Sequence, residues 1–97
     1  MKSKINKEKD KLVFSKETID AAYIRAQSKC ECNRSICGHY YQCAKPLNYN
    51  AQGKDFYAGA WEAHHKLAIS SGGSDGLSNC EILCIDCHKN TGSYGRY

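Results

Sequence analysis

Apolar and polar positions near the start of the chain follow the period of a helix. Ser15 is a typical helix N-cap, and Glu17 lies in the first turn, where the helix dipole favours an anion. Four apolar residues then recur at i, i+3, i+4 and i+7, which puts them on one helical face: Ile19, Ala22, Tyr23 and Ala26. The pattern predicts a helix from residue 15 to about Lys29 that packs this face against the rest of the protein.

The second half of the chain predicts two strands and a helix. Residues 57–69 and Glu81–Cys84 have the composition of strands, and the Gly- and Ser-rich residues 70–79 connect them. A helix should begin at Cys84, reach about Thr91 and end at Gly92. Together with the N-terminal helix, this order predicts a small α+β fold.

Composition limits how such a fold can be stabilised. Ile, Leu, Val and Phe together number only 15 of the 97 residues, so a large apolar core and most large enzyme folds are excluded. We expect one domain over residues 14–97, after a basic and flexible tail over residues 1–13. The sequence has no apolar run long enough to span a membrane and no apolar signal segment. We therefore expect a cytoplasmic protein that does not associate with membranes.

Seven cysteines in so short a chain require an explanation. In a reducing compartment, clustered thiols bind metal more often than they form disulfides. Zinc would also supply folding energy that a small core cannot. A disulfide framework and a redox C-x-x-C pair are the weaker alternatives, and Cys80 suits a small buried apolar position. The candidate ligands fall in a dense loop and in a C-x-x-C pair: Cys30, Cys32, Cys37 and Cys43, then Cys84 and Cys87.

Three histidines offer a second kind of chemistry. His64 and His65 are neighbours in the first predicted strand, and His88 directly follows the C-x-x-C pair. Imidazole is a common ligand of transition metals and a suitable general base near neutral pH. Adjacent side chains of a strand point to opposite faces, so both can serve one site only if the strand end twists or one approaches through a loop. A lone histidine is usually solvated or hydrogen-bonded, but this arrangement of three indicates a site.

These residues together resemble a known family. Residues 61–91, WEAHHKLAISSGGSDGLSNCEILCIDCHKNT, closely resemble the motif of HNH endonucleases. That motif has an acidic residue or His followed by His on a strand, a Gly-Gly loop leading to Asn, a short apolar strand, and C-x-x-C-H opening a helix. The resemblance implies a ββα-metal core over about residues 57–92, with an N-terminal helix and a zinc-stapled cysteine loop.

The resemblance also implies an activity, that of a metal-dependent DNA endonuclease from a bacterium or phage. His65 would be the general base that activates water, and Asn79 would brace the loop and orient that base. His64 and His88 would hold a catalytic divalent cation, Mg²⁺, Mn²⁺, Ni²⁺ or Zn²⁺, that stabilises the phosphate and the leaving 3′ oxygen. We expect folding to bring His64 and His88 around this cation, with His65 facing the same cavity.

A structural zinc would take Cys84 and Cys87 together with two upstream cysteines. The spacing of the upstream four leaves the choice open, and our preferred pair is Cys37 with Cys30 or Cys32, because Gly38 follows Cys37 as in a zinc knuckle. A second zinc, held by the surplus cysteines and His39, also remains open.

Basic residues near the motif indicate how DNA would be held. The net charge of +4 favours a polyanionic partner, and Lys66, Lys89 and Arg96 could reach phosphates. Lys66 and Ala68 depart from the aliphatic residue and the proline that many relatives have there, which affects loop geometry and not the chemistry. A zinc-binding module that recognises DNA or protein without cutting is the alternative function. The sequence leaves open whether the protein acts as a monomer or a homodimer.

Overall fold

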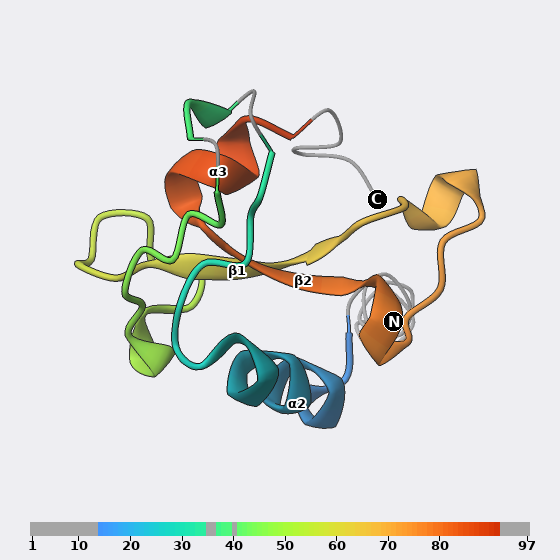
Figure 1. The fold of residues 1–97 in the computed structure, drawn as a ribbon. Helices are drawn as coiled ribbons and strands as arrows, with labels where there is room; N and C mark the ends of the chain where they lie inside the picture. Colours follow the sequence, from blue (N-terminus) through green and yellow to red (C-terminus); the bar gives the residue numbers. More distant parts are fainter. Residues whose placement is uncertain (1–13, 35–36, 40, 92–97) are drawn as a thin grey trace.

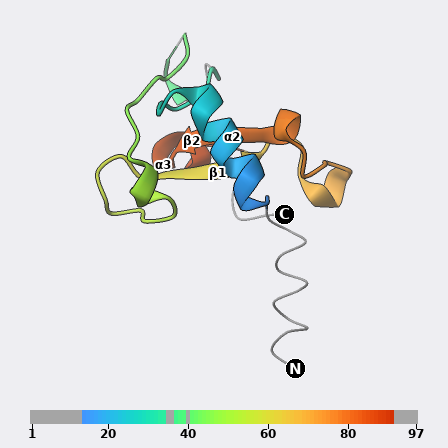
Figure 2. The ribbon, with the colours of Figure 1, turned by 90° about the horizontal axis from the view of Figure 1, so that it is seen from below.

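The computed structural model describes residues 14–34, 37–39 and 41–91. Its helices and strands are α2 (Lys16–Ala26), β1 (Trp61–His65), β2 (Cys80–Cys84) and α3 (Ile85–Lys89). The strands form an antiparallel pair, and α2 and α3 lie on opposite sides of it (Figure 1, Figure 2). This arrangement confirms the predicted small α+β fold and is consistent with a ββα-metal core. The tail over residues 1–13, Gly92 and Arg96 lie outside the described residues.

The helix α2 forms where the apolar pattern predicts it. The Ser15 hydroxyl oxygen accepts a hydrogen bond from the Thr18 backbone N–H and caps the helix. Ala22, Tyr23 and Ala26 are buried, as expected for one face of an amphipathic helix. The helix ends at Ala26, earlier than predicted, because Gln27 adopts a left-handed φ of 56° and its N–H returns to the Ile24 carbonyl.

The strand β1 is shorter than the predicted 57–69. Residues 57–60 form turns instead, and the structure requires glycine at position 59, where a Cβ would lie 2.7 Å from the Asn48 backbone nitrogen. Beyond His65 the chain leaves the sheet and enters the 3₁₀ turn Ile69–Ser71. β1 is therefore confined to the five residues that pair with β2.

The strand β2 is buried along its whole length, from Cys80 to Cys84. One of its faces joins an apolar cluster with α2 and β1, in which Trp61 and Ile82 are fully buried and Cys80 has the small apolar role that was predicted. The other face joins a cluster made mostly of cysteines: Cys30, Cys32, Leu83, Cys84 and Cys87. Because Leu83 is the only aliphatic side chain among these buried residues, apolar burial contributes little to this second cluster.

Among the described residues, no helix combines the length and the apolar character that crossing a bilayer requires.

Candidate active site

Four thiols meet where the cysteine loop packs against the end of β2 and the start of α3. The Sγ atoms of Cys30, Cys43, Cys84 and Cys87 all lie within 4.8 Å of one another. The backbone N–H of Cys84 also donates to the Cys30 sulfur at 3.2 Å. Four convergent sulfur atoms are the donor set of a tetrahedral structural zinc site. This cluster could therefore hold a metal ion such as zinc.

The structure places Cys43, and not Cys37, beside Cys30, while Cys37 lies in a second group with Cys32. The two ends of the cysteine loop run antiparallel, since the Cys43 N–H donates to the Cys32 carbonyl at 2.7 Å and the Ala44 N–H donates to the Cys30 carbonyl at 3.1 Å. This backbone pairing carries Cys43 to Cys30, whereas Cys37 lies next to Cys32, with their sulfur atoms 3.5 Å apart. Contacts between backbone groups distant in sequence decide the choice, so the cysteine spacing could not reveal it.

Ionisation of Cys30, Cys84 and Cys87 in this cluster is coupled. A hydrogen bond from Cys30 lowers the pKa of Cys84 to about 5, and the same contact raises the pKa of Cys30. Burial raises the pKa of Cys87. One thiolate in the cluster thus disfavours ionisation of its neighbours. A divalent cation among them would remove this repulsion, because a metal-coordinated thiol loses its proton.

Two of the three histidines meet on the face of the sheet opposite α2. The rings of His64 on β1 and His88 on α3 have centroids 5.4 Å apart and planes inclined by 69°. Burial lowers the pKa of both rings. The pKa of His64 falls to about 4, and charged neighbours that include Arg34 add to the effect of burial there. Both rings are therefore neutral at pH 7, and neutral imidazole is the form that binds metals.

His65 has different surroundings, contrary to the expectation of one cavity for all three rings. His64 lies opposite Glu81 and His65 opposite Cys80, so strand alternation holds to the last residue of β1. The His65 ring stacks on Phe14 with centroids 3.8 Å apart, and its Nε2 lies 2.9 Å from Oδ1 of Asp75. The structure thus brings His64 to His88 and places His65 on the other face of the same strand end.

The side chain of Asn79, at the end of the loop between the strands, binds both the start of that loop at Leu67 and its second half at Ser74. Its Oδ1 accepts the Leu67 N–H at 2.9 Å, and its Nδ2 donates to the carbonyls of Leu67 at 2.9 Å and Ser74 at 2.7 Å. The side-chain amide therefore makes, with the Leu67 backbone, the two hydrogen bonds that a paired strand residue would make. Because Ser74 adjoins Asp75, these bonds also hold the carboxylate that contacts His65.

The glycine in this loop at position 73 is required by close packing. A Cβ at Gly73 would lie 1.8 Å from the Leu67 carbonyl oxygen, which is closer than any real Cβ contact. Gly76, by contrast, has a negative φ of −78°, and its nearest neighbour to a Cβ would be the Ser74 hydroxyl at 3.4 Å.

The segment that carries these side chains matches a known protein family. The family model described as HNH endonuclease matches residues 41–93, more than half of the chain. The chain belongs to the HNH endonuclease family. It is also 32% identical over 77 residues to the "Type IV methyl-directed restriction enzyme EcoKMcrA" of Escherichia coli (strain K12). The match covers 79% of this chain and 24% of that enzyme, so the chain spans about a quarter of its relative's length. No solved structure matches the chain significantly.

Membership of the HNH family supports nuclease activity at the family level and confirms the resemblance seen in the sequence. The matched segment contains the histidine doublet of β1, the asparagine at the end of the loop and the C-x-x-C-H element. These residues are His64, His65, Asn79, Cys84, Cys87 and His88.

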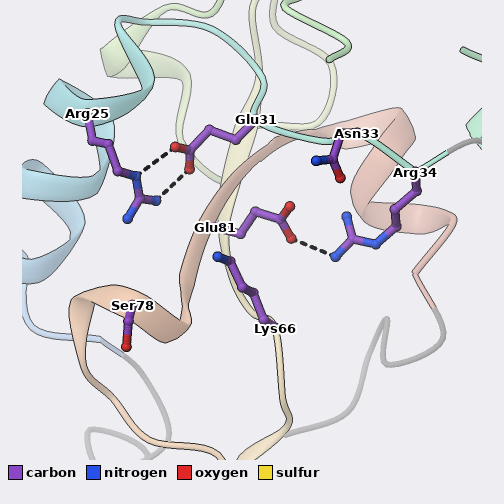
Figure 3. Close-up of a pocket in the computed structure, with 7 residues that line it drawn as sticks. All are labelled: Arg25, Glu31, Asn33, Arg34, Lys66, Ser78 and Glu81. Atoms are coloured by element: carbon purple, nitrogen blue, oxygen red, sulfur yellow. Dashed lines mark hydrogen bonds and ion pairs between the residues drawn. The ribbon is translucent and has the colours of Figure 1, made fainter. Parts of the chain in front are cut away.

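A polar groove of about 510 Å³ lies beside β2 and the end of β1 (Figure 3). Arg25 binds Glu31 through two hydrogen bonds of 2.7 and 2.6 Å, and Arg34 binds the buried Glu81 at 2.6 Å. Of the predicted phosphate-binding residues, Lys66 lines this groove, and Lys89 is exposed at the end of α3. The full lining is Arg25, Glu31, Asn33, Arg34, Lys66, Ser78 and Glu81.

Sequence reasoning missed Asp75, Arg34 and Glu81. A signal for Glu81 existed, because a carboxylate within a short apolar strand that becomes buried needs a charged partner. The sequence holds no signal that identifies Arg34 as that partner, nor one that singles out Asp75 within a loop rich in small polar residues.

Proposed function

We propose that this HNH protein is a metal-dependent DNA endonuclease that hydrolyses phosphodiester bonds. The observation that carries the proposal is the contact between His64 and His88, whose ring centroids lie 5.4 Å apart although they come from different elements. Two neutral imidazoles at this separation suit a divalent cation such as Mn²⁺, Ni²⁺, Zn²⁺ or Mg²⁺. When bound, the cation would act as a Lewis acid toward the phosphate and the leaving 3′ oxygen.

His65 is the proposed general base, and Asp75 is its positioning residue. A carboxylate only accepts hydrogen bonds, so Asp75 favours the tautomer of His65 with the proton on Nε2. Nδ1 is then free of a proton and can take one from the attacking water. In this proposal Asn79 acts through the backbone, by holding the loop that carries Asp75.

The placement of His65 opposite the other two histidines is compatible with this chemistry. In an in-line displacement, the attacking and leaving oxygens lie on opposite sides of phosphorus. A phosphate at the end of β1 would have His65 on the side of the attacking water and the His64–His88 pair on the side of the leaving oxygen. The phosphate would therefore bind across the strand end and not inside a closed pocket.

The charge of the chain and the character of its relative support DNA as the substrate. The net charge of +4 favours a polyanion, and the relative is named as a restriction enzyme. Lys66, in the groove, follows the two histidines directly and is the first proposed phosphate contact. Exposed Lys89 and, beyond the described residues, Arg96 are further proposed contacts.

A structural zinc in the cluster of Cys30, Cys43, Cys84 and Cys87 completes the proposal. Because Cys87 immediately precedes His88, an ion at this cluster would fix the helix that carries a catalytic ligand. The reducing cytoplasm, which is the proposed location, keeps such thiols available for metal.

Nicking of supercoiled plasmid DNA tests the proposed function. We expect cleavage with Mn²⁺, Ni²⁺, Mg²⁺ or Zn²⁺ by the native protein and none by His65→Ala, whose zinc content and circular dichroism should be unchanged. Glu17→Ala, an exposed change on α2, serves as the control and should cleave normally. Cleavage by His65→Ala would reject the assigned base. DNA binding without cleavage by the native protein under all four cations would instead favour a non-catalytic zinc module.

A further inference from the structure

We propose that the cysteine loop holds two zinc ions that share the thiolate of Cys87. Besides the four-cysteine cluster, the structure assembles a second set of donors, Cys32, Cys37, His39 and Cys87, whose ligand atoms also lie within 4.8 Å of one another. Cys87 belongs to both sets. The inference concerns the metal content of the chain and does not depend on the proposed nuclease activity.

The number of donors matches two ions and a single bridge. Two tetrahedral ions have eight ligand positions. The two sets together contain six cysteines and one histidine, and a bridging Cys87 would occupy two positions. Cys80 belongs to neither set, because it lies in the apolar cluster beneath α2. Every cysteine outside that apolar cluster therefore has a place in the two-ion arrangement.

Distances within the second set fit one ion. The sulfur atoms of Cys32 and Cys37 lie 3.5 Å apart, and the sulfur of Cys87 lies 3.7 Å from Nε2 of His39. A tetrahedron with Zn–S of about 2.3 Å and Zn–N of about 2.0 Å has S···S edges of about 3.8 Å and S···N edges of about 3.5 Å. Both observed separations agree with these edges to within about 0.3 Å, and the sulfur separation is far longer than the roughly 2.05 Å of a disulfide.

The tautomer of His39 suits a metal ligand. Its Nδ1 lies 2.6 Å from the Tyr41 backbone carbonyl oxygen. Because a carbonyl only accepts hydrogen bonds, the proton must reside on Nδ1, which leaves a lone pair on the Nε2 that faces Cys87. Metal-binding histidines almost always donate their other ring N–H in this way, most often to a carbonyl or carboxylate.

Arg34 prepares Cys32 for the same role. Its backbone N–H lies 3.4 Å and its guanidinium 3.5 Å from the Cys32 sulfur. Both groups donate hydrogen bonds that stabilise a thiolate, and the positive charge offsets part of the negative charge of six thiolates around two dications. The same guanidinium binds Glu81, which lies opposite His64 in the sheet. Through Arg34 and Glu81, the second ion would thus be linked to β2, the strand that pairs with the strand of His64.

Zinc stoichiometry tests the proposal. Elemental analysis of the full chain, purified under reducing conditions, should give two zinc ions per chain. Cys37→Ser and His39→Ala should each give one, with an unchanged circular dichroism spectrum, because the four-cysteine cluster stays complete. The matched control Cys80→Ser should keep two. One zinc in the native chain, or native zinc content in both Cys37→Ser and His39→Ala, would overturn the second site; no zinc at all would also reject the structural zinc of the proposed function.

The bridge has its own readout. After exchange of zinc for ¹¹³Cd, two resonances with mutual scalar coupling through the Cys87 sulfur are expected, and His39→Ala should leave a single uncoupled resonance. Two uncoupled resonances from the native chain would show two ions without a shared thiolate and would overturn the bridge. If the variants fail to fold, stepwise release of zinc from the native chain to a chelator decides the stoichiometry, since a single step of one ion would contradict the proposal.

Discussion

The guanidinium of Arg34 lies 2.6 Å from the carboxylate of Glu81, whose side chain is only 8% exposed. The pair joins the cysteine loop to the second residue of β2, which is paired with His64 on β1. The hydrogen bond that Arg34 donates keeps its own pKa raised in spite of its partial burial, and Arg34 in turn contributes to the low pKa of His64. The two residues thus link the fold of the loop to the protonation of a proposed metal ligand.

Removal of Arg34 should therefore destabilise the protein. A hydrogen bond between charged groups is worth about 1.5–3 kcal/mol, and we expect Arg34→Ala to lower the free energy of unfolding by about that amount, because it leaves the buried Glu81 without this partner. Urea denaturation with zinc present measures the change. Lys16→Ala, which removes an ion pair with Asp20 on the exposed face of α2, is the control and should have no measurable effect. Equal effects of the two variants would contradict the importance of the buried pair.

Substitution of Gly73 should impair catalysis through the loop. In Gly73→Ala the added Cβ cannot remain 1.8 Å from the Leu67 carbonyl, so the loop must shift and the bonds from Asn79 must break or lengthen. A misplacement of about 1 Å can cost about 10²-fold in rate, and we expect a loss of that order in plasmid nicking with zinc content unchanged.

Gly76→Ala is the matched control for this loop, since the nearest atom to its Cβ would lie 3.4 Å away at a φ of −78°. Its nicking rate should stay close to that of the native protein. The assigned packing at Gly73 would be wrong if the two alanine variants cut DNA equally well.

Cation binding at the His64–His88 pair should respond weakly to pH. Protons compete with a cation for ring nitrogens, and the pKa of His64 is lowered from its ordinary 6.5 to about 4 because burial disfavours the charged ring. Competition at His64 should therefore begin only as the pH falls toward 4, and burial shifts the pKa of His88 in the same direction. Mn²⁺ affinity, measured by electron paramagnetic resonance, should change little between pH 8 and pH 6.5.

The variant His64→Ala should lose this Mn²⁺ site while it keeps its zinc. A steep loss of affinity in the native protein as the pH falls from 8 to 6.5 would indicate histidines whose pKa is not lowered and would argue against their burial.

Removal of zinc should unfold the protein. The buried cysteine cluster on the α3 side of the sheet contains Leu83 as its one aliphatic side chain, so the apolar contribution to folding there is small. With a chelator and a reductant present, we expect loss of the helical circular dichroism signal and its recovery when zinc is returned in excess. A native-like spectrum of the metal-free chain would show that the apolar cluster under α2 is sufficient for folding.

Much of this protein could be predicted from local sequence. The period of Ile19, Ala22, Tyr23 and Ala26 located α2 and its buried face, because amphipathic helices depend on contacts between residues three and four apart. The same holds for the type and order of β1, β2 and α3, whereas the ends of the elements were less accurate. β1 stops at His65 because pairing with β2 ends there.

Which of several chemically equivalent side chains lie together depends on the tertiary structure. Local sequence predicted that thiols and imidazoles are the candidate metal donors and that a ββα arrangement carries them. Only folding decided that Cys43 joins Cys30, that Cys37 and His39 meet Cys87, and that His65 turns away from His64. Sequence spacing limits how far apart two ligands can be, but the backbone hydrogen bonds between distant segments and the alternation of the paired strand set which side chains actually converge.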